Sequence, residues 1–468
     1  MPTMRAVAGS FRDPDSRVFV CDGVVYRALS ARGMDDWSAL SASDAFVELL
    51  ERGSLVETHE VVRDAPARLG DSWAGVLQHA AIPFVSYPYE WTFGMLRDAA
   101  LLQLDVLERC IGDSLMVKDS SPYNIQWRGA APVFIDIGSF ERLREGEPWI
   151  AYRQFCMLFL YPLMFQAYKD IPFGPWLRGA IDGIAPAQAR AVMSFRDRLR
   201  RGVVTNVHLH SRLERRYARV EGNKAKDEVR RAGFNTEMIL ANVRRLRKLV
   251  GRMDWDPGTS AWTGYREDST HLEADAQHKA AFVAKAAARR KQRLAWDVGA
   301  NDGAYSRIAA ESADFVVAMD VDHPTVERLY RTLKDEDERR ILPLVVDACD
   351  PSPALGWRGR ERDTLDRRGR PSLTLCLAVV HHMAITRNVP VREIVDWLAS
   401  LGGTVVVEFP ERGDPMVQRL LAGKREDSHG DYGREHFERC LEDAFVVERR
   451  SVSPSGRRVL YEVRGLGA

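Results

Sequence analysis

Five short apolar runs in the second half of the chain alternate with stretches in which apolar residues recur at helical spacing. The runs lie at 294–298, 315–319, 341–346, 373–380 and 404–407. Short strands that alternate with helices predict a parallel sheet. Two further runs, 444–449 and 458–463, flank the turn at 454–456 and predict a closing β-hairpin. The second half is therefore expected to be an α/β domain.

The first half mixes strands with helices. Residues 17–28 are expected to form two strands joined by a tight turn, followed by a helix that Ser43 or Asp44 caps. Further strands are expected at 54–58 and 84–86. This pattern predicts an α+β arrangement for the beginning of the chain.

Helical spacing dominates the middle of the chain. An apolar helix capped by Asp98 is expected first, and the pattern is helical throughout from residue 149 to residue 253. The stretch 254–260 is rich in turn-forming residues and marks a domain boundary. We therefore expect two domains, 1–253 and 254–468.

The composition is that of an ordinary soluble protein, with 28% charged residues and a net charge of +1. This balance gives no overall attraction to nucleic acid or to an anionic membrane. The most apolar run, 155–165, is shorter than the roughly 20 residues of a membrane-spanning helix. The six cysteines form no C-x-x-C pair and no secretory signal is seen, so we expect a cytoplasmic protein with reduced thiols.

A glycine-rich turn joins the first strand of the second half to its helix. It reads Asp297-Val298-Gly299-Ala300-Asn301-Asp302-Gly303. Glycines at the end of a strand let a ligand approach the backbone amides closely, and the helix N-terminus points at whatever binds there. The second strand ends on Asp320, which is suited to the two hydroxyls of a ribose, and the third ends on Asp347, which could accept from an adenine amino group. These features predict a nucleoside pocket at the carboxyl edge of the sheet.

Together these segments resemble motifs I, post-I and II of class I S-adenosylmethionine-dependent methyltransferases. The resemblance implies a Rossmann-like, seven-stranded sheet that ends in an antiparallel hairpin, with S-adenosyl-L-methionine as the cofactor. It places Asp320 on the ribose and Asp347 on the adenine, and it makes Tyr265 and Lys279 candidates for lining the cofactor site. The residues that it places at the methionine end are Asp297, Gly299, Asn301 and Gly303. The alternative is a nucleotide-binding α/β domain that uses NAD, which a terminal hairpin does not favour.

Two adjacent histidines follow the fourth strand. That strand runs straight into His381-His382, where the resemblance puts the transferring methyl group. A histidine titrates near neutrality and could take a proton from the acceptor as a general base. Neighbouring residues of an extended segment face opposite sides, so only one could act and the other would pack or hold a loop. The fifth strand ends on Glu408, which either binds the acceptor or caps the strand.

A second informative segment lies in the first half. It reads Asp119-Ser120-Ser121-Pro122-Tyr123-Asn124 and is followed by a strand that ends on Asp136. This pattern resembles the catalytic and metal-binding loops of aminoglycoside-phosphotransferase-like kinases. The resemblance implies an α+β kinase-like domain in which Asp119 accepts the proton of the attacking hydroxyl. Asn124 and Asp136 would hold the magnesium ions that bridge the phosphates of ATP.

Several parts of such a kinase are missing from the sequence. Lys118 stands where a histidine or glycine usually precedes the aspartate, and we find no glycine-rich loop. Arg27, with Glu48 as its expected partner, is the nearest substitute for the usual lysine. Three hypotheses stay open: a degenerate kinase fold that recognises substrate or holds the architecture, an active kinase that uses ATP and magnesium, and an unrelated fold.

A further resemblance covers most of the chain. His381-His382, the loop at 388–390, Glu408-Phe409-Pro410 and the segment 119–124 are similar to bacterial methyltransferases related to the nodulation protein NoeA. The expected function is methyl transfer to an oxygen or nitrogen of a small-molecule or glycan-type acceptor. The alternatives are a bifunctional kinase–methyltransferase and a non-catalytic cofactor-binding scaffold. The near-zero net charge disfavours a nucleic-acid acceptor, and nothing in the sequence indicates the oligomeric state.

Overall fold

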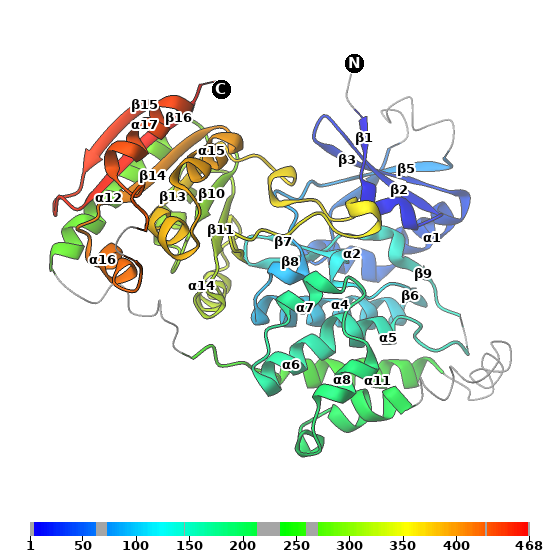
Figure 1. Ribbon diagram of the computed structural model, residues 1–468. Coiled ribbons are helices and arrows are strands. Elements are labelled where there is room, and N and C mark those ends of the chain that lie inside the picture. Colours follow the sequence, from blue (N-terminus) through cyan, green and yellow to red (C-terminus); the bar gives the residue numbers. More distant parts are fainter. Residues whose placement is uncertain are drawn as a thin grey trace. The chain divides into compact units, whose positions relative to one another are not determined.

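The computed structural model describes residues 4–61, 73–144, 146–212, 235–258, 270–425 and 428–466. They form two compact units, each of which is described by itself (Figure 1). Unit 1 comprises Met1–Trp127, Pro132–Asp256 and Ala354–Asp363, and unit 2 comprises Arg128–Ala131, Pro257–Pro353 and Thr364–Ala468. The expected contiguous division at residue 253 differs from this one in two short segments: Arg128–Ala131 belongs to unit 2, and Ala354–Asp363 belongs to unit 1. A hydrophobic pattern does not show on which unit such a loop packs.

Unit 1 begins with an antiparallel sheet of five strands in the order β1-β2-β3-β5-β4. The strands are β1 Met4–Ala6, β2 Ser16–Cys21, β3 Val24–Leu29, β4 Thr58–Glu60 and β5 Gly75–His79. The predicted hairpin of β2 and β3 is confirmed. Helices α1 (Ala31–Ser41) and α2 (Asp44–Glu51) follow β3, and the Ser43 hydroxyl caps α2 by accepting a hydrogen bond from the N–H of Phe46.

Two predictions for the next segment are wrong. No strand forms around Ser86, because the side-chain amide of Gln126 bonds both its N–H and its C=O, at 2.9 and 3.0 Å. Asp98 caps no helix, because α4 (Phe93–Gly112) begins earlier, with Thr92 as its cap. Asp98 lies buried inside α4.

The rest of unit 1 packs helices around two short strand pairs. Strand β6 (Leu115–Val117) pairs with β9 (Phe140–Arg142), and β7 (Ile125–Arg128) pairs with β8 (Ala131–Phe134). The helices are α5 Tyr152–Phe155, α6 Tyr161–Lys169, α7 Gly174–Gly179, α8 Pro186–Val192 and α11 Thr236–Gly251. The apolar run 155–165 is a buried helical segment, as predicted. Among the helices of the described residues, none combines the length and apolarity needed to cross a membrane.

Unit 2 is built on a seven-stranded sheet in the order β12-β11-β10-β13-β14-β16-β15. Its strands are β10 Ala295–Val298, β11 Val316–Asp320, β12 Ile341–Val345, β13 Leu373–Cys376, β14 Thr404–Pro410, β15 Phe445–Val452 and β16 Arg458–Gly465. Strands β10 to β14 are parallel, and β16 runs antiparallel to both of its neighbours. The predicted seven-stranded sheet with a closing hairpin is confirmed.

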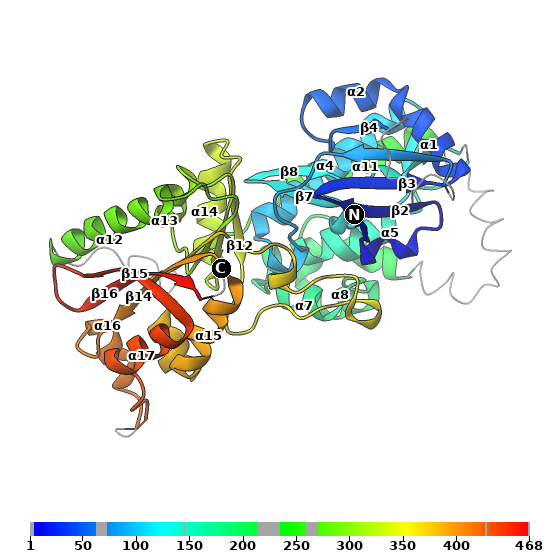
Figure 2. The same ribbon diagram turned by 90° about the horizontal axis from the view of Figure 1, so that it is seen from above.

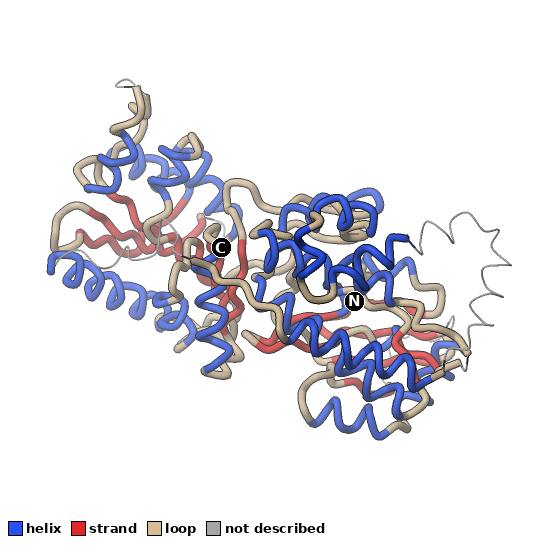
Figure 3. Tube along the Cα trace, turned by 90° about the horizontal axis from the view of Figure 1, so that it is seen from below, coloured by secondary structure: helices blue, strands red, loops and turns tan. Residues whose placement is uncertain are grey.

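Helices cover both faces of this sheet. They are α12 Thr270–Ala288, α13 Ala304–Ala310, α14 His323–Asp335, α15 Val391–Leu401, α16 Pro415–Leu421 and α17 Arg434–Ala444. Figure 2 shows α12, α13 and α14 on one face and α15, α16 and α17 on the other, and Figure 3 shows the strands of unit 2 between these layers. Because the strand order reverses between β10 and β13, a crevice is expected at their carboxyl ends.

Candidate functional site

A cavity of about 1040 Å³ lies in unit 2 at the carboxyl ends of the parallel strands. Open α/β sheets bind their ligands at this edge, and pockets for small molecules reach roughly this size. The predicted site residues that line it are Gly299, Asn301, Asp320, Asp347 and His382, together with Lys279. Tyr265 lies outside the described residues. The structure thus brings most of the predicted cofactor residues to one cavity.

The glycine turn adopts backbone conformations that the sequence anticipates. Gly299 has a φ of +78°, and a Cβ atom at this position would collide with Cγ2 of Val379. Gly303 has a φ of +77°, and its Cβ would lie 2.7 Å from Cδ1 of Leu329. Only glycine fits both the left-handed backbone and the close packing at these two positions. Gly299 therefore lines the cavity as bare backbone, and Gly303 lets α13 start against α14.

Asp320 is fixed at the rim of the cavity by two backbone amides. Its Oδ2 accepts from the N–H of Asn301 and its Oδ1 from the N–H of Asp322, both at 2.9 Å. Burial raises the pKa of Asp320 above its usual range, although these hydrogen bonds oppose the shift. The carboxylate thus ties the glycine turn to the end of β11.

Asp297 lies behind the glycine turn instead of on the cavity. Its side chain is buried, and its Oδ2 accepts a hydrogen bond of 2.6 Å from the Ser306 hydroxyl at the start of α13. Burial raises the pKa of Asp297 to about 7, against the hydrogen bond from Ser306. Asp297 therefore holds the turn and the helix together.

Asp347 lines the cavity after β12 and has a partner that the sequence did not indicate. Its Oδ1 accepts from the N–H of Cys349 at 2.9 Å, and its Oδ2 forms an ion pair with Arg387, which also lines the cavity. Arg387 follows the histidine pair in sequence by only a few residues. It reaches Asp347 because β12 and β13 both end at this edge of the sheet. Only the order of the strands in the sheet could have predicted this ion pair.

The two histidines do not continue a strand as predicted. Strand β13 ends at Cys376, and the chain turns at Ala378, which has a φ of +55°. His381 and His382 then begin a short helical turn with their ring centroids 4.0 Å apart. His382 lines the cavity, whereas His381 is fully buried and neither of its ring nitrogens has a hydrogen-bond partner within the described residues.

Both imidazoles are kept neutral at pH 7. Burial, with a smaller contribution from the charge of Arg458, lowers the pKa of His381 to about 2 and that of His382 to about 4. A neutral ring that faces the cavity can accept a proton. Of the two histidines, His382 is therefore the one that can accept a proton from a molecule in the cavity.

Glu408 is almost completely buried and anchors two cations of the cavity wall. Its Oε2 lies 2.7 Å from Nζ of Lys279, and its Oε1 lies 3.6 Å from a guanidinium nitrogen of Arg458. Nε of Arg458 also pairs with Asp414 at 2.8 Å. Burial alone raises the pKa of Glu408, but the charges of Lys279 and Arg458 bring it below its usual range. Glu408 thus acts on the cavity through Lys279 and Arg458.

Two residues of this wall were not predicted from the sequence. Arg458 begins β16, and it reaches the site because it pairs in register with Pro410 at the end of β14. Tyr305 lines the cavity at the start of α13, with its ring centroid 5.6 Å from Nζ of Lys279. No local motif marks either residue, so only the sheet order and the helix position could have identified them.

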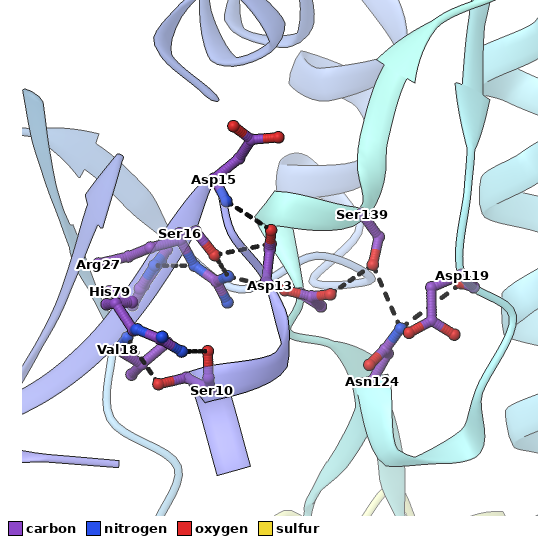
Figure 4. Close-up of polar contacts among 12 residues, drawn as sticks. Ser10, Asp13, Asp15, Ser16, Val18, Arg27, His79, Asp119, Asn124 and Ser139 are labelled. Atoms are coloured by element: carbon purple, nitrogen blue, oxygen red, sulfur yellow. Dashed lines mark hydrogen bonds and ion pairs between the residues drawn. The ribbon is translucent and has the colours of Figure 1, made fainter. Parts of the chain in front are cut away.

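Unit 1 brings the three predicted kinase-like residues, Asp119, Asn124 and Asp136, into one cluster. Figure 4 shows two of them, Asp119 and Asn124, beside Ser139. Nδ2 of Asn124 donates to the Ser139 hydroxyl at 3.2 Å and, at 3.5 Å, to the carbonyl of Asp119. The Ser139 hydroxyl bonds Oδ2 of Asp136. Burial, and then the charge of Asp136, raise the pKa of Asp119. Within the described residues no group of three or more His, Cys, Asp or Glu side chains is arranged to hold a metal ion.

The expected pair of Arg27 and Glu48 is not formed. Arg27 instead lies 2.8 Å from Oδ1 of Asp136. Glu48 pairs with Arg109 of α4 and, at 3.6 Å, with Arg52. Because α2 presents Glu48 to α4, this carboxylate does not reach the strand that carries Arg27.

Comparison with known proteins places the chain beside one curated relative over nearly its whole length. It is 31% identical over 464 residues to the nodulation protein NoeA of Rhizobium meliloti (strain 1021), covering 98% of this chain and 96% of that protein. No protein-family model matches the chain. The match to NoeA therefore spans both units.

Two solved structures resemble part of the chain. The N-methyltransferase NodS of Bradyrhizobium japonicum WM9, in complex with S-adenosyl-L-homocysteine, is 12% identical with a TM-score of 0.32, covering 45% of this chain and 95% of its own. The magnesium protoporphyrin IX methyltransferase ChlM of Synechocystis PCC 6803, with bound SAM, is 16% identical with a TM-score of 0.32, covering 44% and 93%.

Proposed function

The chain belongs to the family of the nodulation protein NoeA, and from this premise and the cavity of unit 2 we propose that it is an S-adenosylmethionine-dependent methyltransferase. The observation that supports this most is that the glycine turn, Asp320 and Asp347 meet at one cavity. These features, from three successive strands, suit the methionine end, the ribose and the adenine of the cofactor. The proposed acceptor is an oxygen or nitrogen of a small molecule or glycan-type compound.

The cofactor would be held mainly by fixed groups. Each oxygen of Asp320 already accepts one backbone N–H, and each retains a lone pair that can accept a ribose hydroxyl. Asp347 would accept from the adenine amino group while Arg387 keeps its carboxylate in place. Such prior positioning reduces the entropy that is lost on binding.

Methyl transfer from a sulfonium is a direct displacement, so the chain must align the acceptor, exclude water and remove a proton. His382 is the proposed proton acceptor because it lines the cavity in neutral form. With a pKa of about 4 it is a weak base toward a neutral hydroxyl. His382 is therefore expected to take the proton after the bond to the methyl carbon has formed, because that bond makes the proton on the methylated atom acidic.

Calorimetry with S-adenosylmethionine tests the proposal. Wild type should bind the cofactor, and Asp320→Ala should lose most of this binding. The matched control is Asp314→Ala, because Asp314 precedes β11 at the opposite end of the same strand and is largely exposed. Undetectable binding to wild type, or equal losses in both variants, would refute the assignment.

For unit 1 we propose a kinase-like domain that recognises substrate or supports the architecture. Support comes from the order of its elements: Asp119 and Asn124 lie between β6 and β7, and Asp136 follows β8. The bifunctional alternative predicts magnesium-dependent ATP turnover that Asp136→Ala abolishes. A search for compounds that gain the mass of one methyl group, in extracts with and without the enzyme, tests the scaffold alternative and identifies the acceptor.

A further inference from the structure

The Asp136 carboxylate of unit 1 already has a cation. One guanidinium nitrogen of Arg27 lies 2.8 Å from Oδ1 of Asp136 and 3.1 Å from the Ser16 hydroxyl. Oδ2 of Asp136 is bonded by Ser139. Both oxygens of the carboxylate that the kinase resemblance assigns to a metal ion are therefore engaged by groups of the chain itself.

A chain of hydrogen bonds fixes the position of Arg27. The Thr58 hydroxyl donates to the carbonyl of Val56 at 2.9 Å, so it accepts at 2.8 Å from Nδ1–H of His79. Nε2 of His79 is therefore unprotonated, and its lone pair accepts a hydrogen bond of 3.3 Å from Nε–H of Arg27. Burial, and then the charge of Arg27, lower the pKa of His79 to about 3, which keeps this ring neutral. Arg27 is thus held from β4 and β5 while its guanidinium pairs with Asp136. Figure 4 shows Arg27 beside His79 and Ser16.

The pair is closely packed on the side of Gly138. A Cβ atom on Gly138 would lie 2.9 Å from the Arg27 guanidinium, 3.1 Å from the Ser16 hydroxyl and 3.2 Å from Oδ2 of Asp13. The hollow lined by Asp13, Ser16 and Gly138 has a volume of about 10 Å³, which is barely that of one water. Asp13, Asp15 and Asp36 border it together with Lys118, so carboxylates outnumber cations in its lining and would repel a nucleotide phosphate.

We infer that Arg27 is a built-in cation at Asp136, occupying the position of a divalent ion, so that this cluster works without metal and without nucleotide. The inference rests on the kinase-like assignment of unit 1 and is independent of cofactor binding by unit 2. Removing the guanidinium should expose a cation site formed by Asp136 with the oxygens of Asp119 and Asn124, since carboxylate and amide oxygens suit hard divalent cations.

Titration of the full-length protein with Mn²⁺, followed by the electron paramagnetic resonance signal of the free ion, tests this directly. Arg27→Met should bind Mn²⁺ at least about tenfold more tightly than wild type, because an unpaired carboxylate is left partly buried. The double variant with Asp136→Asn should lose this gain. Arg32→Met is the matched control, because Arg32 is exposed and only loosely paired with Asp15 and Glu141.

Measurements on wild type, Asp136→Asn and Arg27→Lys test the inference if Arg27→Met does not fold. Calorimetry with ATP, Mg²⁺ and both together should detect no binding that depends on Asp136, and Arg27→Lys should remain free of Mn²⁺. Binding of Mn²⁺ or of magnesium–ATP to wild type that Asp136→Asn abolishes would overturn the inference. A folded Arg27→Met with wild-type Mn²⁺ affinity would do the same. Calorimetry with S-adenosylmethionine is unaffected by either result, so the two proposals fail separately.

Discussion

Nζ of Lys279 lies 2.7 Å from Oε2 of Glu408, and this ion pair is almost completely buried beside the cavity of unit 2. Lys279 comes from the middle of α12 and Glu408 from β14, so the pair joins a covering helix to the sheet. Burial lowers the pKa of Lys279, and the nearby charge of Glu408 opposes this shift. The lysine can remain charged at this depth because its carboxylate partner is within hydrogen-bond distance.

Glu408→Gln should destabilise unit 2 strongly. The change leaves Lys279 buried without its anion and removes one partner of Arg458, which is expected to lower the free energy of unfolding by about 3–5 kcal/mol. Urea denaturation at pH 7 measures the effect. Glu336→Gln is the control, because it breaks the exposed pair of Glu336 and Arg307 (2.6 Å), which should contribute about 0–1 kcal/mol. Similar losses in the two variants would contradict the anchoring role of Glu408.

Gly299→Ala should impair both stability and cofactor binding. The left-handed backbone adds about 1–2 kcal/mol of strain for alanine, and the new methyl group collides with Val379. Adding Val379→Ala should relieve the collision but not the strain, so the double variant should recover only part of the loss. Gly423→Ala is the control, since open space surrounds that position. Thermal unfolding and calorimetry check both effects, and full recovery in the double variant would rule out the backbone contribution.

Asp297 should make the stability of unit 2 fall as the pH rises. Its pKa is raised by burial to about 7 in the folded chain and is about 3.9 in the unfolded chain. Between these values the folded state binds more protons than the unfolded state, so this group lowers the free energy of unfolding from about pH 4 to pH 7. Asp297→Asn should therefore gain stability relative to wild type across this window. Urea denaturation at several pH values checks this, and a pH-independent difference would show that the pKa is not raised.

His382→Ala should slow methyl transfer more than it weakens cofactor binding. Loss of a general base typically lowers kcat by about 10²–10⁴-fold, whereas the calorimetric affinity for S-adenosylmethionine should change little. Since burial lowers the pKa of His382 to about 4, wild-type kcat should show no inflection from this group between pH 6 and pH 8. His436→Ala, on α17, is a control for replacing a histidine outside the cavity. Unchanged kcat in His382→Ala would exclude a role in proton removal.

Local patterns determined the fold of unit 2 and the outline of its proposed cofactor site. Buried strands separated by helices are specified by the spacing of apolar residues, and the turn at 297–303 is specified by Gly299 and Gly303, whose left-handed backbone other residues rarely adopt. Asp320 and Asp347 were identifiable because they lie at or just beyond the ends of strands, so the parallel sheet brings them to the same edge. The closing hairpin followed from the turn between two apolar runs.

Tertiary structure alone decided which side chains complete the site. Arg458 and Glu408 meet only because β16 inserts between β14 and β15, which places Arg458 beside the end of β14. The choice of His382 over His381 depends on a left-handed turn at Ala378 that ends the strand early. These outcomes depend on strand order and on packing between segments distant in the chain, and neither is encoded in a local run of residues.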